Sequence, residues 1–184
     1  MMTSRNLTQD GFALLLTLIV ISVVLAVGLS LLHITMKQLT LSNVARDSEI
    51  AIHAARSGIE CMQYQRQQPG NLSLLLDGGT PLGLKCFNRS ATESEAYRDG
   101  NLYNYRYTYN LGADMCVETS LYLIDAQSET SDVTKDISTR NEGLLELTCT
   151  EGAVCTTIFS RGYNRRCDDR DSFLTVQREL TIQF

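Results

Sequence analysis

The stretch Phe12–Leu32, FALLLTLIVISVVLAVGLSLL, decides the fold of this 184-residue chain. It holds about 21 residues without a charge, enough for a helix to cross a hydrocarbon core of ~30 Å. A core helix of a soluble domain rarely stays apolar on every face over this length. A cleaved secretory signal has a shorter apolar run with an A-x-A site soon after it, and no such site follows here. The run therefore predicts a membrane-spanning helix.

The residues after this run predict that the same helix continues with a single apolar face. Spacings near three, four and seven relate Met36, Leu39, Ile50, Ala54, Ala55, Gly58, Ile59 and Met62, with Asn43 as a polar interruption. No proline occurs before Pro69, and Pro69-Gly70 is a stop signal. One helix of roughly 55 residues, about 80 Å long, is expected. The two halves of the helix must lie in different environments, because only the first half is apolar on every face.

The segment QDGFALL, residues 9–15, resembles the class III signal of type IV prepilins and pseudopilins. The resemblance extends over residues 8–64 and includes AARSGIE at 54–60. It implies that a prepilin peptidase cuts between Gly11 and Phe12 and that Phe12 becomes N-methylated. It also implies a leader at residues 1–11, a stalk helix at 12–68 that is transmembrane over 12–32, and an extracytoplasmic head at 69–184.

Two residues depart from the family pattern. Most major pilins have a glutamate as the fifth residue of the mature chain, where this sequence has Leu16. An unpaired carboxylate in a bilayer is costly, and the family members that lack it are PilX-type or tip-forming minor pilins, so Leu16 favours a minor subunit. Asp10 stands where a basic residue usually precedes the glycine, which leaves Arg5 as the only cation of the leader.

The remainder of the chain predicts an α+β fold with an antiparallel sheet packed on the helix. Residues 71–101 are expected to form a loop, and LYNYRYTYNL at Leu102–Leu111 a strand. Its alternation places Tyr103, Tyr105, Tyr107 and Tyr109 against the helix and Asn104, Arg106, Thr108 and Asn110 toward solvent. A carbohydrate-binding aromatic platform is the alternative role for the tyrosines. Further strands are expected at 115–124, 143–150, 156–163 and 173–184, and a polar surface loop or partner-binding edge at 125–142.

The six cysteines predict an oxidising compartment and structural disulfides among Cys61, Cys86, Cys116, Cys149, Cys155 and Cys167. Fifteen pairings are possible. Cys149 and Cys155 bracket a short segment that suits a hairpin closure, and any bond of Cys61 would fasten the head to the helix. A metal site is the alternative, but His33 and His53 do not neighbour a cysteine in sequence. Neither a metal nor a cofactor is expected.

The net charge and the lack of known catalytic motifs argue against two classes of function. A net charge of −5 with scattered cations gives no basic stripe, so no direct nucleic-acid binding is expected. No catalytic motif occurs, so an enzyme is not expected.

The resemblance implies a minor pilin or pseudopilin, held as a single-pass protein in the cytoplasmic membrane before assembly into a surface filament. Its partners would be other pilin subunits, the prepilin peptidase, the inner-membrane assembly platform and lipid. Pilus biogenesis, adhesion, motility, secretion and DNA uptake all stay open. A signal-anchored binding protein that stays in the membrane, or a membrane-tethered enzyme, are the competing functions.

Overall fold

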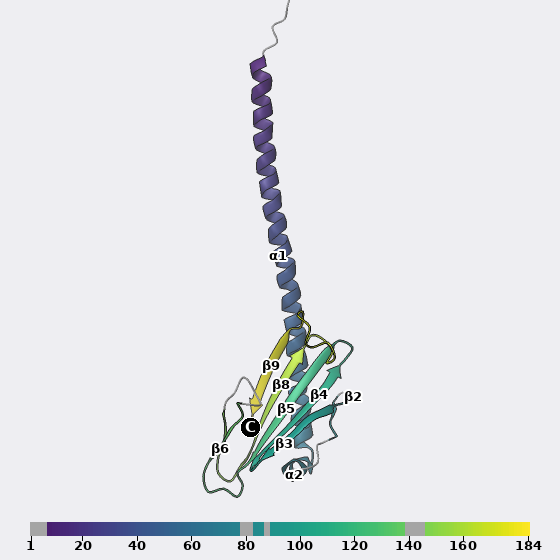
Figure 1. Cartoon of the computed structure of the whole chain (residues 1–184), viewed down its shortest axis with the longest axis vertical. Helices are drawn as coiled ribbons and strands as arrows, with labels where there is room; N and C mark the ends of the chain where they lie inside the picture. Colours follow the sequence, from purple (N-terminus) through teal and green to yellow (C-terminus); the bar gives the residue numbers. More distant parts are fainter. Residues whose placement is uncertain (1–6, 78–82, 87–88, 139–145) are drawn as a thin grey trace, which may run out of the picture. The chain divides into compact units, whose positions relative to one another are not determined.

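The computed structural model describes residues 7–77, 83–86, 89–138 and 146–184 (Figure 1). The chain divides into two compact units, Met1–Ala45 and Arg46–Phe184. Helix α1, Leu7–Gln67, supplies the described part of the first unit and continues into the second. The second unit also holds the strands and all three disulfides.

Helix α1 begins five residues earlier than the expected start of the stalk helix at Phe12, so it includes residues 7–11 of the expected leader. It ends at Gln67 because the proline ring of Pro69 is incompatible with further helix. Gly70 has a φ of 84°, a left-handed conformation that glycine adopts without steric cost. The chain turns there into the short helix α2, Asn71–Leu76.

A five-stranded antiparallel sheet is the main element of the second unit. Its strands are β3 (Thr92–Asp99), β4 (Leu102–Leu111), β5 (Met115–Asp125), β8 (Val154–Tyr163) and β9 (Gln177–Gln183), in the order β3-β4-β5-β8-β9. Two small hairpins accompany it, β1 (Lys85–Cys86) with β2 (Arg89–Ser90), and β6 (Val133–Asp136) with β7 (Glu146–Cys149). The predicted α+β class, long apolar helix, antiparallel sheet and disulfides are therefore present.

Three sequence-based expectations about the strands were wrong in part. The expected loop at 71–101 contains α2, β1, β2 and the edge strand β3, and the expected loop at 125–142 contains β6. The expected strand at 173–184 begins only at Gln177, because Phe173 and Leu174 lie in a turn before β9. Residues 143–145 of another expected strand lie outside the described residues, and β7 starts at Glu146.

The inner face of the sheet packs on the second half of α1, as predicted for the tyrosines. Tyr103, Tyr105, Tyr107 and Tyr109 are buried in one core with Ala54, Ile59 and Met62 of α1. The Tyr105 hydroxyl donates a hydrogen bond to the Leu75 carbonyl at 2.7 Å, and burial raises the pKa of Tyr109 to about 12. These rings are therefore core residues of this fold rather than an exposed carbohydrate platform.

Side-chain size decreases across the inner face from β4 to β8. In one row of register partners Tyr109 on β4 is followed by Val117 on β5 and Gly162 on β8. A Cβ at Gly162 would lie closer than 3.0 Å to backbone atoms of Ala51 and Ala55. The row ends at Arg178 on β9, whose Nε donates to the Ser48 hydroxyl at 2.8 Å. Small residues thus let α1 approach β8 closely.

The outer face of the sheet is only partly exposed to solvent. The expectation that this face of β4 is solvent-exposed was therefore wrong in part. Asn104 is fully buried, and Arg106, Thr108 and Asn110 are only partly exposed. Beside Asn104, a second core joins Leu102, Tyr122, Ile124 and Phe159 to residues of the 126–149 excursion, namely Ala126, Ile137, Leu147 and Cys149. The excursion therefore covers one end of the outer face.

Candidate functional site

The N-terminal part of α1 presents large apolar side chains to its surroundings. Between Phe12 and Val44 every described residue is exposed, and the first charged side chain after Asp10 is Lys37. Among the described residues, α1 is the one helix that is long and apolar enough to cross a membrane. An exposed apolar surface of this size is typical of a site that contacts a membrane or another protein.

Two hydroxyl groups within this apolar segment donate to carbonyls of their own helix. Thr17 donates to the Leu14 carbonyl at 2.8 Å, and Ser22 donates to the Ile19 carbonyl at 2.8 Å. Such bonds leave no unpaired hydroxyl donor at these two positions for the hydrocarbon to accommodate. The segment between Phe12 and Leu32 therefore behaves as an apolar helix in spite of its polar residues.

The expected processing site lies inside α1. Gly11 and Phe12 are consecutive helical residues, and the Phe12 side chain is exposed. Glycine destabilises a helix interior by about 1 kcal/mol relative to alanine, so the helix is locally weak at the expected scissile bond. Leu16 is likewise exposed, on the next turn.

The six cysteines form three disulfides in the second unit. Cys61 on α1 bonds to Cys86 on β1, Cys116 on β5 bonds to Cys167, and Cys149 bonds to Cys155. The first fastens α1 to the strand hairpin, as a bond from Cys61 would have to do. The third joins the end of β7 to the start of β8, the closure that the short spacing suggested. No cysteine is free.

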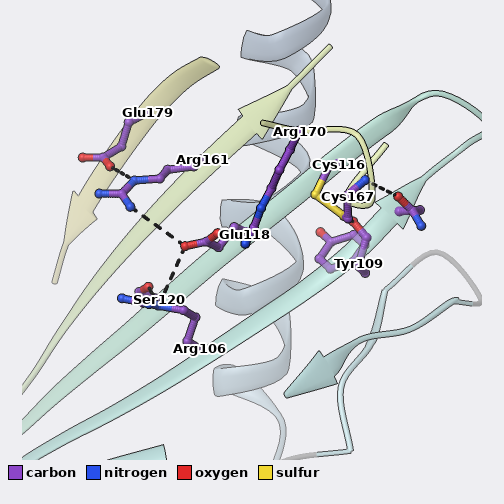
Figure 2. Close-up of polar contacts among 10 residues, drawn as sticks. Arg106, Tyr109, Cys116, Glu118, Ser120, Arg161, Cys167, Arg170 and Glu179 are labelled. Carbon is purple, nitrogen blue, oxygen red and sulfur yellow. Dashed lines mark hydrogen bonds and ion pairs between the residues drawn. A yellow bond between two sulfur atoms is a disulfide. The ribbon is translucent and has the colours of Figure 1, made fainter. Parts of the chain in front are cut away.

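A charged cluster occupies the middle of the outer face, opposite α1 (Figure 2). The buried carboxylate of Glu118 on β5 lies 2.8 Å from Arg170, 3.8 Å from Arg106 on β4 and 3.9 Å from Arg161 on β8. Arg161 also pairs with Glu179 on β9 at 2.5 Å. These three arginines and two glutamates join five segments of the chain, namely β4, β5, β8, β9 and the segment between β8 and β9.

Residues 164–176, between β8 and β9, are named here the C-terminal loop. The Cys116–Cys167 disulfide and a hydrogen bond from the Cys167 amide to Asn110 Oδ1 at 2.9 Å tie its first half to β4 and β5 (Figure 2). The Val176 amide donates to Asn164 Oδ1 at 2.7 Å, which closes the base of the loop. The loop is therefore fixed at its base, at Cys167 and at Arg170.

We expect Arg170→Ala to lower the free energy of unfolding by about 1–2 kcal/mol, because it removes a charge-assisted hydrogen bond to a buried carboxylate. Arg166→Ala is the matched control on the same loop, since the Arg166–Asp168 pair is largely exposed and should contribute less than about 0.5 kcal/mol. Urea unfolding of both variants measures the difference. Equal effects would contradict the assigned role of Arg170.

The two histidines lie apart on α1. His33 and His53 are exposed residues of α1, in the first and the second unit respectively. Within the four described ranges, no group of three or more His, Cys, Asp or Glu side chains is arranged to hold a metal ion. A polar cleft of about 280 Å³ lies between α1 and the C-terminal loop and is lined by Asp47, Asp114, Asn164, Arg165, Arg166 and Asp169.

The Glu118 cluster was not predicted from the sequence. Its members come from four strands and a loop, and only the register places Arg106 near Glu118 and Glu118 opposite Arg161. Alternation of charged residues along each strand is the available signal, but it does not say which strands are neighbours.

Comparisons with known proteins found no match: no protein-family model, no curated protein and no solved structure is significantly similar to this chain. Function is therefore inferred from the residues and their geometry.

Proposed function

We propose that this chain is a minor type IV pilin-like or pseudopilin-like subunit of an extracytoplasmic filament. One observation carries the proposal: a single helix that is apolar and exposed around its first half and packed on a disulfide-bonded sheet along its second. Such a helix suits lipid before assembly and other apolar helices after it, since both surround it with apolar groups. The same segment thus serves as membrane anchor and as assembly surface.

The processing signal supports this function over a permanent membrane anchor. The glycine-phenylalanine step at 11–12 stands directly before the apolar run, where cleavage leaves the whole run in the mature chain. The disulfides support a head outside the cytoplasm, because thiols stay reduced inside it. The proposed partners are other pilin subunits, a prepilin peptidase and an inner-membrane assembly platform.

N-terminal sequencing and intact mass of the chain taken from membranes test the proposal. A start at an N-methylated Phe12, with the chain also present in sheared filaments, is the expected result. An intact leader and absence from filaments would instead favour a signal-anchored binding protein.

Leu16 predicts a low copy number in the filament. In the proposed assembly, a carboxylate at this position would neutralise the N-terminal amine of the neighbouring subunit, and leucine cannot do so. We expect this chain to be much less abundant in sheared filaments than a glutamate-bearing subunit from the same cell. Quantitative mass spectrometry measures the ratio, and a dominant share for this chain would refute the minor-subunit assignment.

A further inference from the structure

Among the described residues of the second unit, the most exposed aromatic side chain lies on the C-terminal loop. Phe173 is 93% exposed and its neighbour Leu174 is 54% exposed. Single exposed apolar residues are common on protein surfaces and carry no argument alone. Here, however, two consecutive ones lie on a loop that the fold holds in place.

The loop has little freedom to bury these side chains by itself. Three successive turns run through it, with the amides of Asp169, Ser172 and Thr175 donating to the carbonyls of Arg166, Asp169 and Ser172. The disulfide at Cys167, the ion pair of Arg170 and the Asn164–Val176 bond hold it to the sheet. An apolar anchor that is already ordered loses less entropy when a partner covers it.

The charges of the loop identify the class of partner. Its three arginines are matched by three aspartates in sequence. The pairs Arg165–Asp169, Arg166–Asp168 and Arg170–Glu118 use every arginine of the loop. A loop without excess positive charge has no electrostatic attraction for anionic lipid or nucleic acid. An uncharged, apolar protein surface is the better complement for Phe173 and Leu174.

The position of the C-terminal loop also indicates which protein surface could contact Phe173 and Leu174. Asp47 of α1 lines the same cleft as Asn164, Arg165 and Asp169, and Arg178, just after the loop, binds Ser48. The C-terminal loop therefore lies beside the first helical turn of the second unit (Figure 1). A neighbouring helix packed alongside α1 at this level would meet the loop.

We propose that Phe173 and Leu174 dock against an apolar stalk helix of the next subunit in the filament. This chain shows the chemistry of such a partner: α1 exposes Ile34, Met36, Leu39, Leu41 and Val44. Contact between two different surfaces of successive subunits is a heterologous interface, which builds an open helical filament when its rotation does not close into a ring. The inference rests on the proposed function and adds the head residues that make the contact.

Photo-crosslinking in assembling cells tests the contact directly. With benzoylphenylalanine in place of Phe173, we expect crosslinks that map by mass spectrometry to the stalk helix of a neighbouring subunit. The same probe at Thr181, which is exposed on β9 away from the loop, should crosslink to that helix at least tenfold less. Crosslinks of the Phe173 probe to lipid, to an unrelated protein or to no neighbour would overturn the proposal.

A pair of variants separates this inference from the proposed function. Phe173→Asp should lower the amount of the chain in sheared filaments about tenfold, with its membrane level, its cleavage at Phe12 and its melting temperature unchanged. Phe173→Leu should restore incorporation. If the wild-type chain enters filaments and Phe173→Asp enters equally well, the docking inference alone fails. If the wild-type chain is uncleaved and absent from filaments, the proposed function fails and the docking inference fails with it.

Discussion

Gly162→Ala is expected to destabilise the second unit by more than about 3 kcal/mol, in spite of the small size of the change. In most strands this substitution is favourable or neutral, because alanine lowers the entropy of the unfolded chain. At Gly162 the added methyl group would lie closer than 3.0 Å to the Ala51 carbonyl oxygen, the Ala55 amide nitrogen and the Ala54 Cβ. Two of these are backbone atoms, so no rotamer change relieves the clash. The helix must move off the sheet, which places the cost at the upper end of the range for overpacking.

Two further glycines provide the controls for this experiment. Gly83→Ala should change stability by less than about 0.5 kcal/mol, since nothing lies within 4 Å of its added Cβ. Gly58→Ala on α1 should have an intermediate effect, because its Cβ would meet side chains of Ser160, Thr119 and Val117, and these can shift in part. The free energies of unfolding of the three variants are measured by urea unfolding of the full chain in detergent, monitored by the near-ultraviolet circular dichroism of its tyrosines. A stable Gly162→Ala protein would show that the helix and β8 are less closely packed than the structure has them.

The long helix was the part of the fold most open to prediction. An uncharged run of helix length and the first stop at Pro69 specify it almost completely. Its start was less predictable, because residues 7–11 belong to the helix by continuity and carry no N-terminal signal of their own. The four tyrosines were equally clear, since strict alternation over ten residues leaves one face of β4 to the core.

The missed strands lack that alternation. Strand β3, TESEAYRD, has few apolar residues because it is an edge strand, and a register shift between Glu93 and Glu95 further breaks its period. Among the described residues, strand β6 pairs with β7 alone. The few apolar residues of its segment, such as Ile137, cover the outer face of the main sheet. A short or edge strand with few apolar residues carries almost no local signal. The burial of Asn104 follows from the same excursion and could not be foreseen from β4 alone.

Some candidate sites could likewise be predicted from the sequence, and others could not. The apolar segment and the glycine-phenylalanine step are contiguous in sequence, and reading the chain is enough to find them. The cysteine pairing, the Glu118 cluster and the exposure of Phe173 each depend on which segments the fold brings together. The sequence contains their residue types but not their proximity.

Gly11→Leu is expected to abolish maturation while the chain still inserts in the membrane. In the uncleaved chain Gly11 is a helical residue, so a peptidase must unwind the helix locally to reach the bond before Phe12. Glycine makes this opening easier by about 1 kcal/mol relative to alanine, and it also presents no side chain to the enzyme. Leucine removes both advantages and adds an apolar group that favours the intact helix. Since the apolar run from Phe12 is unchanged, insertion should be unaffected.

The control is Gly28→Leu, a glycine in the same helix with nothing within 4 Å of its added Cβ. It introduces the same side chain into the apolar run, about four and a half turns from the expected scissile bond, so cleavage should proceed at the wild-type rate. Gel mobility and intact mass of the membrane fraction follow both variants. An uncleaved Gly11→Leu chain beside a cleaved Gly28→Leu chain is the expected pair of results. Normal cleavage of Gly11→Leu would show that Gly11 is not part of a processing signal. The apolar segment would then favour a permanent membrane anchor over an assembly helix.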